Sequence, residues 1–147
     1  MTAIERGRAG DRAGAAAELE RLWHTTGSDA LQRVTIAHFL ADLQDDPHDE
    51  LLWDTRALDA VALLTDERAQ GHHASLQVAG FLPSLHLNLA DVLRRLGRDD
   101  EARAHLATSR AHLASLADDG YGATIRAGVR HVEEAIAAGH RERLPSH

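Results

Sequence analysis

The sequence contains no cysteine and no lysine, and only 3% of its residues are aromatic. Without cysteine the chain can form no disulfide, no thiolate metal site and no thiol nucleophile. Arginine supplies all 16 basic residues against 23 acidic ones, so the formal charge is −7, which repels phosphate and argues against a nucleic-acid partner. Leu, Val, Ile and Ala must therefore build the interior, and such a composition favours helices.

Long apolar runs are also missing. No segment approaches the roughly 20 apolar residues of a membrane span, and residues 1–6 lack the apolar core of a signal peptide. We therefore expect a cytoplasmic protein without a membrane partner. A chain of 147 residues suits a single domain that buries about two thirds of its unfolded surface.

Apolar residues recur at intervals of three and four, which predicts an all-α protein. The expected helices cover residues 13–23, 29–43 and 47–65, an antiparallel hairpin over about 82–117, and 121–139. The spacing on the 47–65 helix assigns these residues to its inner side: Leu51, Leu52, Thr55, Leu58, Val61 and Ala62. Between helices, residues 66–80 are predicted to be an insertion that is helical toward its C-terminal end, and residues 140–147 a frayed tail.

A glycine or acidic turn recurs near residues 10, 45 and 97, and the first two turns lie one helical-hairpin repeat apart. The hairpin at 83–117 resembles the tetratricopeptide repeat family. The positions that carry this resemblance are Asn88, Leu89, Ala90, Leu93, Leu96, Gly97, Glu101, Ala102 and Leu106. The chain departs from the family pattern at His86, where the family has Trp, and at Ser109, where it has Ala.

The resemblance implies a short solenoid of stacked antiparallel helical hairpins. Its repeats would cover about 1–27, 28–65 and 81–117, followed by a C-terminal capping helix at 121–139. The family's first helices line a concave groove, so the resemblance also implies a non-catalytic module that binds a peptide or partner protein. Each hairpin has an apolar face that it cannot bury alone, and stacking leaves an extended surface.

The predicted groove combines polar residues from three helices. An Asn at the position of Asn88 binds the ligand backbone in peptide-binding relatives, and an Arg can pair with a carboxylate through two parallel hydrogen bonds. A solvated face with an Asp91–Arg95 helix pair is the alternative. The predicted groove residues are Thr35, His38, Asp42, Ser84, Asn88, Asp91, Arg95, Arg126 and Arg130, with Tyr121 at the groove mouth. The two C-terminal arginines favour an acidic or carboxylate-bearing ligand.

Eleven histidines raise the question of a metal. His105 and His112 are seven residues apart and share a helix face, and His72 and His73 are adjacent. No HExxH or similar spacing occurs, so we expect no metal and no cofactor. No phosphate loop or nucleophile elbow is present, and we expect no enzyme. The alternatives are a self-associating structural protein, as a homodimer rather than a monomer, and a small metal- or ligand-binding enzyme that uses the histidines.

Overall fold

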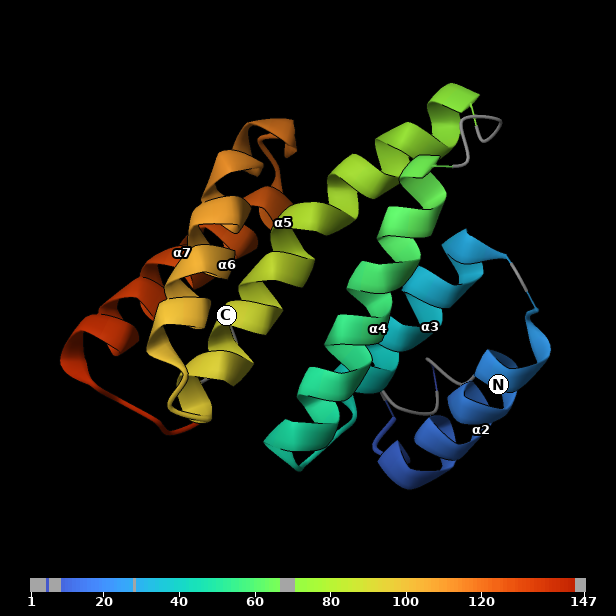
Figure 1. The fold of residues 1–147 in the computed structure, drawn as a ribbon, viewed down its shortest axis with the longest axis horizontal. Helices are drawn as coiled ribbons and strands as arrows, with labels where there is room; N and C mark the ends of the chain where they lie inside the picture. Colours follow the sequence, from blue (N-terminus) through green and yellow to red (C-terminus); the bar gives the residue numbers. More distant parts are fainter. Residues whose placement is uncertain (1–4, 6–8, 28, 67–70, 145–147) are drawn as a thin grey trace. The chain divides into compact units, whose positions relative to one another are not determined.

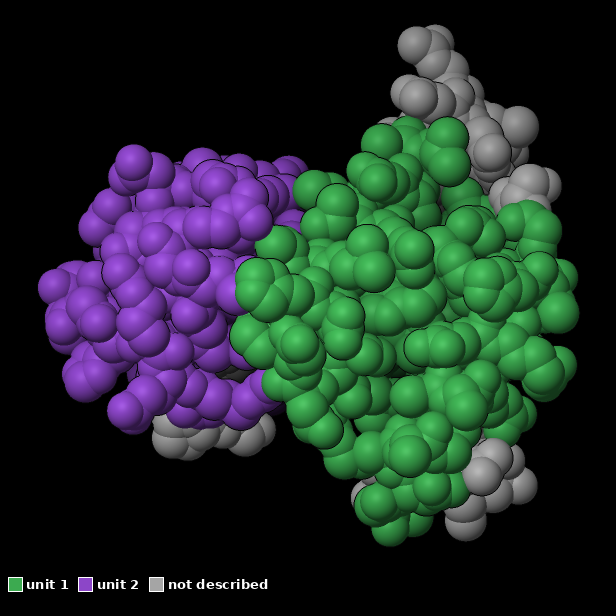
Figure 2. Space-filling view, turned by 60° about the horizontal axis from the view of Figure 1, so that its bottom comes forward, with its two compact units in different colours: residues 1–70 green, residues 71–147 purple. Residues whose placement is uncertain are grey.

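The structure is a computed structural model that describes residues 5, 9–27, 29–66 and 71–144. These residues form six α-helices, one short 3-10 helix and no strand, so the predicted all-α class is confirmed. The chain divides into two compact units, Met1–Gln70 and Gly71–His147 (Figure 2). The boundary lies inside the segment predicted to be an insertion. Parts of the predicted first repeat, insertion and tail lie outside the described residues, and the stacking of hairpins into one solenoid stays a prediction.

The first unit contains three helices: α2 (Arg12–Thr25), α3 (Ala30–Asp42) and α4 (Pro47–Asp66) (Figure 1). Within this unit α3 packs against both of the others. An aspartate precedes each helix and accepts a hydrogen bond from a free backbone amide of the first turn. The acceptors are Asp11, Asp29 and Asp46, at 3.1, 3.1 and 2.8 Å from the nitrogens of Gly14, Gln32 and His48.

Two tryptophans dominate the interior of the first unit. Trp23 of α2 and Trp53 of α4 are buried and meet edge to face, with ring centroids 5.3 Å apart. The guanidinium of Arg33 lies 3.6 Å from the centre of the Trp23 ring, and that of Arg56 lies 4.5 Å from the centre of the Trp53 ring. The two arginines thus cover the aromatic pair through cation–π contacts.

The predicted inner face of α4 is wrong in part. Leu52 is 46% exposed, and Thr55 and Ala62 are exposed as well. Val61 is buried as predicted, and the buried face otherwise carries Trp53, Asp54, Ala57 and Ala60. The helix is rotated from the expected register because burying the large Trp53 ring removes more apolar surface from water than burying Leu52.

The second unit consists of α5 (Gly71–Arg95), α6 (Asp99–Ala111), the 3-10 helix η2 (Leu113–Ser115) and α7 (Gly120–Ala138) (Figure 1). The helices α5 and α6 form the predicted hairpin, joined at Gly97, whose φ of 80° is the left-handed conformation that glycine tolerates. The last helix, α7, packs against both. It ends at Gly139, as predicted.

The helix α5 begins eleven residues before the expected start near 82. It runs through Pro83, which is buried and carries no amide proton for the helical ladder. The hydroxyl of Ser109 on α6 donates to the Pro83 carbonyl, with 2.7 Å between the oxygens. This buried hydrogen bond ties the proline turn of α5 to α6.

None of the described helices combines the length and the apolar character that crossing a lipid bilayer requires.

Candidate functional site

The predicted polar stripe on α5 is engaged in contacts within the chain. Ser84 is buried, and Asn88 is half-buried. The Asp91 carboxylate accepts from Arg94 through one oxygen, at 2.7 Å, and pairs with Arg95 through the other, at 3.2 Å. The Arg95 side chain is only 7% exposed. Asp91 therefore pairs with both arginines of its own helix, and Asn88 is a predicted stripe residue outside this pairing.

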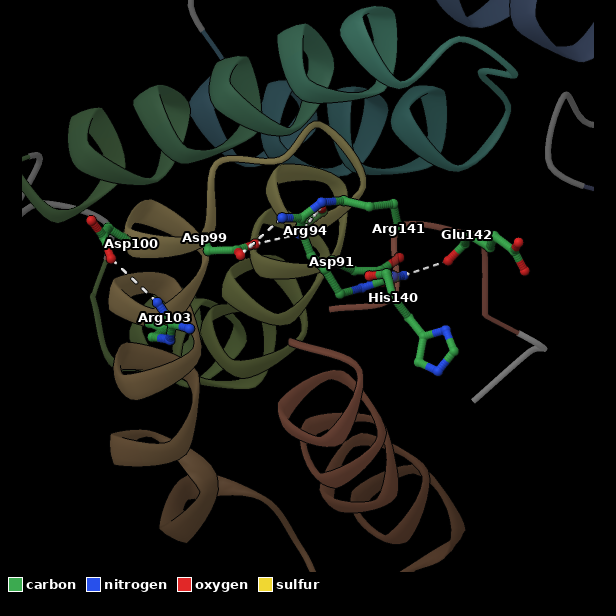
Figure 3. Close-up of polar contacts among 8 residues, drawn as sticks. All are labelled: Asp91, Arg94, Asp99, Asp100, Arg103, His140, Arg141 and Glu142. Atoms are coloured by element: carbon green, nitrogen blue, oxygen red, sulfur yellow. Dashed lines mark hydrogen bonds and ion pairs between the residues drawn. The ribbon is translucent and has the colours of Figure 1, made fainter. Parts of the chain in front are cut away.

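Arg94 is the residue that sequence reasoning missed. Its side chain is fully buried, and it binds Asp91 and the carbonyl oxygens of His140 and Glu142, at 2.7 and 2.8 Å (Figure 3). Two hydrogen bonds of one guanidinium thus join α5 to the segment after α7, while the same group is paired with Asp91 of its own helix. No local pattern marks Arg94, because its carbonyl partners lie 46 and 48 residues away in the sequence.

The segment that follows α7 is anchored, in contrast to the predicted frayed tail. Besides the contacts of Arg94, the Arg141 guanidinium donates to both carboxylate oxygens of Asp99, at 2.6 and 3.0 Å, and to the Arg94 carbonyl (Figure 3). The hydrogen bond from Arg141 lowers the pKa of the Asp99 carboxyl. Residues 140–142 therefore belong to the folded unit, and residues 145–147 lie outside the described residues.

The remaining predicted groove residues belong to different helices. On α3, Thr35 donates its hydroxyl to the Leu31 carbonyl of its own helix, and Asp42 is exposed. Burial lowers the pKa of His38, and the nearby Asp42 carboxylate opposes this shift. These three residues lie in the first unit and the others in the second, so a groove shared by α3 and α5 stays a prediction.

An open groove of roughly 300 Å³ lies between α6 and α7 within the second unit. Leu106 and Ile136 are buried and form its floor. Ala107 and Ala137 at its sides are small and exposed, so the groove stays open to solvent. Arg110 of α6 pairs with Glu133 of α7 across the groove. The complete lining is Arg103, Leu106, Ala107, Arg110, Glu133, Ile136 and Ala137. This groove uses the second helix of the hairpin and the capping helix, rather than the first helices that the resemblance implies.

The predicted arginines of α7 extend the same helix face. Arg126 and Arg130 precede Glu133 by seven and three residues, spacings that keep side chains on one side of a helix. Arg130 is exposed, and the half-buried Arg126 donates to the Leu116 carbonyl, at 3.3 Å. Tyr121 is 51% exposed but lies about three turns before Glu133 and does not line the groove.

A cluster of three histidines lies at the α5/α6 hairpin. His86 of α5 and His105 of α6 face each other with their Nδ1 atoms 3.0 Å apart, and their rings stack at 5.2 Å between centroids. The ring of His112, after α6, stacks on His86 at 6.5 Å. The shared face of His105 and His112 was predicted from their spacing. His86 was not, because only the register of the hairpin brings it between them.

Burial, followed by the neighbouring His105 and His112, lowers the pKa of His86 from 6.5 to about 4. Burial also lowers the pKa of His105, against the opposing effect of Glu101. Both imidazoles are therefore neutral near pH 7. In a neutral pair one Nδ1 donates its proton and the other accepts it.

We expect the free energy of unfolding to decrease as the pH is lowered, because of His86. The unfolded chain protonates this ring near pH 6.5, before the folded chain does near pH 4, so stability is complete above the unfolded pKa and is lost as the pH decreases through this window. At about 1.4 kcal/mol per pKa unit, reduced by solvent contact of the ring, the loss should be about 2 kcal/mol.

Urea unfolding followed by circular dichroism in metal-free buffer, at a series of pH values between the two pKa values, measures this loss. His86→Gln removes the titrating ring and should flatten the curve relative to the unmodified chain. His131→Gln changes an exposed histidine of α7 and serves as the matched control. An equal pH dependence in His86→Gln and the unmodified chain would contradict the assignment.

The chain matches no family model, no curated protein and no solved structure.

Proposed function

We propose that this chain is a non-catalytic binding module that holds an acidic segment of a partner protein in the α6/α7 groove. The observation that carries the proposal is the combination of an apolar floor with arginines along the rim. Leu106 and Ile136 offer apolar contact, and Arg103 and Arg110 offer planar donors for carboxylates. A short partner helix with apolar and acidic residues on one face would satisfy both parts of the groove.

Charge distribution favours an acidic rather than a basic partner. The chain as a whole carries −7, yet the groove lining contains two arginines and one glutamate. Arg126 and Arg130 add positive charge along the same face of α7. Because Asp100 and Glu133 balance the two lining arginines, the excess positive charge comes from Arg126 and Arg130. It would attract a negatively charged segment and repel a basic one.

Arg103 and Arg110 can exchange their internal partners for a carboxylate of a partner protein. Arg103 pairs with Asp100, and Arg110 with Glu133, and in both pairs the side chains are at least half exposed. Exposed ion pairs of this kind contribute about 0–1 kcal/mol. A carboxylate of the partner can therefore replace the internal acid at small cost, which is unlike the buried pairing of Arg94 with Asp91.

A pair of labelled peptides tests the proposal. One is a short fluorescein-labelled helical peptide with Leu and Glu on the same face, and the other has every Glu replaced by Lys. Fluorescence anisotropy should show that the acidic peptide binds at least tenfold more tightly and that added salt weakens its binding. Equal binding of the two peptides would overturn the proposed charge preference.

Variants at two alanines of α6 can show where the peptide binds. Ala107 lines the groove, whereas Ala104 is exposed on the same helix but outside the lining. We expect Ala107→Glu to weaken the acidic peptide about tenfold, or about 1.4 kcal/mol, because the new carboxylate occupies the groove and repels the ligand. Ala104→Glu adds the same charge and should bind like the unmodified chain. Identical affinities of the two variants would exclude this groove.

A further inference from the structure

The imidazole pair of His86 and His105 lies outside the groove and has no role in the proposed binding of a peptide. These two rings face each other across the α5/α6 hairpin with Nδ1 atoms 3.0 Å apart. In neutral rings one Nδ1 must carry the proton that the other accepts. Two nitrogen ligand atoms are thus already held at a separation that a single metal ion can span.

We propose that His86 and His105 form a two-histidine binding site for a divalent transition-metal ion, Cu²⁺ in preference to Ni²⁺ and Zn²⁺. Two imidazole nitrogens at about 2.0–2.1 Å from one ion and 3.0 Å from each other subtend an angle of about 95° at the metal. This angle is close to the right angle between neighbouring ligands in tetragonal coordination, which Cu²⁺ adopts with nitrogen ligands. Tetrahedral Zn²⁺ requires a wider angle.

The pair can bind a metal ion without losing a proton. Each metal ligand must be an imidazole nitrogen with a free lone pair. When the ion binds, the proton on the donating Nδ1 moves to Nε2 of the same ring, and both Nδ1 lone pairs bind the metal. The step releases no proton to the solvent.

Water would supply the other ligands. Among the residues that the structure describes, no three His, Asp or Glu side chains are arranged to hold a metal ion together. The nearest acid of α6, Glu101, is committed to Arg98 through two hydrogen bonds, at 2.7 and 2.8 Å. His112 stacks on the His86 ring and packs against the pair. The site therefore has two protein ligands and leaves coordination positions open.

Titration of Cu²⁺ into the untagged chain tests the proposal. Electron paramagnetic resonance and visible absorption should show one equivalent bound in a nitrogen-ligated tetragonal site, ahead of weaker binding by the other histidines. His105→Gln should abolish this first equivalent, because one imidazole alone does not chelate. His131→Gln removes an exposed histidine of α7 and should retain it. Retention of the first equivalent in His105→Gln, or its absence from the unmodified chain, would overturn the proposal.

A second measurement separates binding at this pair from adventitious binding elsewhere. An ion that binds the folded pair stabilises the folded chain by mass action, so Cu²⁺ should raise the urea midpoint of the unmodified chain and of His131→Gln. The midpoint of His105→Gln should not rise. His105 is half-buried, and circular dichroism without metal will verify that this variant folds. Equal stabilisation of all three proteins would exclude the pair as the site.

Discussion

Replacing Arg94 with alanine is expected to lower the free energy of unfolding by about 3–5 kcal/mol, the usual cost of breaking a buried ion pair by removing one partner. The side chain is fully buried and binds Asp91 and the carbonyls of His140 and Glu142. Its removal leaves these acceptors without their donor and releases the segment after α7. Urea denaturation followed by circular dichroism measures the loss.

The chain contains its own control for this prediction. Asp100 and Arg103 have the same spacing as Asp91 and Arg94, but their side chains are 102% and 57% exposed (Figure 3). Arg103→Ala should therefore cost less than about 1 kcal/mol. If both alanine variants lose the same stability, burial is not what makes Arg94 important.

Arg94→Met distinguishes the charge of the side chain from its volume. Methionine fills much of the space of the arginine stem but donates no hydrogen bond. We expect Arg94→Met to recover only part of the stability lost in Arg94→Ala, because the two carbonyls remain without a donor. Full recovery would show that Arg94 acts through packing alone.

Trp53→Ala should destabilise the first unit by about 3–5 kcal/mol, the usual cost of truncating a buried aromatic side chain. The Trp53 ring is 6% exposed, meets Trp23 edge to face, and carries the guanidinium of Arg56 on its surface. The truncation removes both contacts and leaves a cavity. Urea unfolding should be followed by circular dichroism, since the variant lacks one of the two fluorophores.

Leu52 provides the matched control for this variant. It precedes Trp53 on α4 and is 46% exposed, so Leu52→Ala should cost well under 1 kcal/mol. The spacing of apolar residues in the sequence predicts the opposite result, because it assigns Leu52 to the inner side of α4. A larger loss for Leu52→Ala than for Trp53→Ala would contradict the burial pattern of the structure.

The sequence predicts the helices well where a local signal marks their ends. Asp29, Asp46 and Asp119 each accept a hydrogen bond from a first-turn amide, and Gly97 and Gly139 have positive φ angles. These features depend on a few neighbouring residues, which a sequence displays directly. The start of α5 is the exception. Glycine and proline indicate a break before residue 84, yet α5 continues through Pro83, which is buried and whose carbonyl accepts from Ser109 of α6.

Burial and pairing are harder to predict than helix boundaries. Alanine suits both exposed and buried positions, so an Ala-rich helix such as α4 has an ambiguous inner face. Arg94 and Arg95 look alike in the sequence, and nothing in it shows that Arg94 reaches carbonyls distant in the chain. The groove depends on packing between α6 and α7, and His86 joins its cluster through the hairpin register. The periodicity of the sequence shows neither the packing of α6 against α7 nor the register of the hairpin.

The distribution of the aromatic residues makes the two units spectroscopically distinct. Both tryptophans lie in Met1–Gln70, whereas the single tyrosine lies in Gly71–His147 and is already half exposed in the folded state. Indole emission consequently originates from the first unit alone. Biosynthetic incorporation of fluorotryptophan would give a ¹⁹F NMR spectrum with two resonances, both reporting the Trp23–Trp53 contact. Ligands of the α6/α7 groove can then be studied in the second unit without indole emission from that unit.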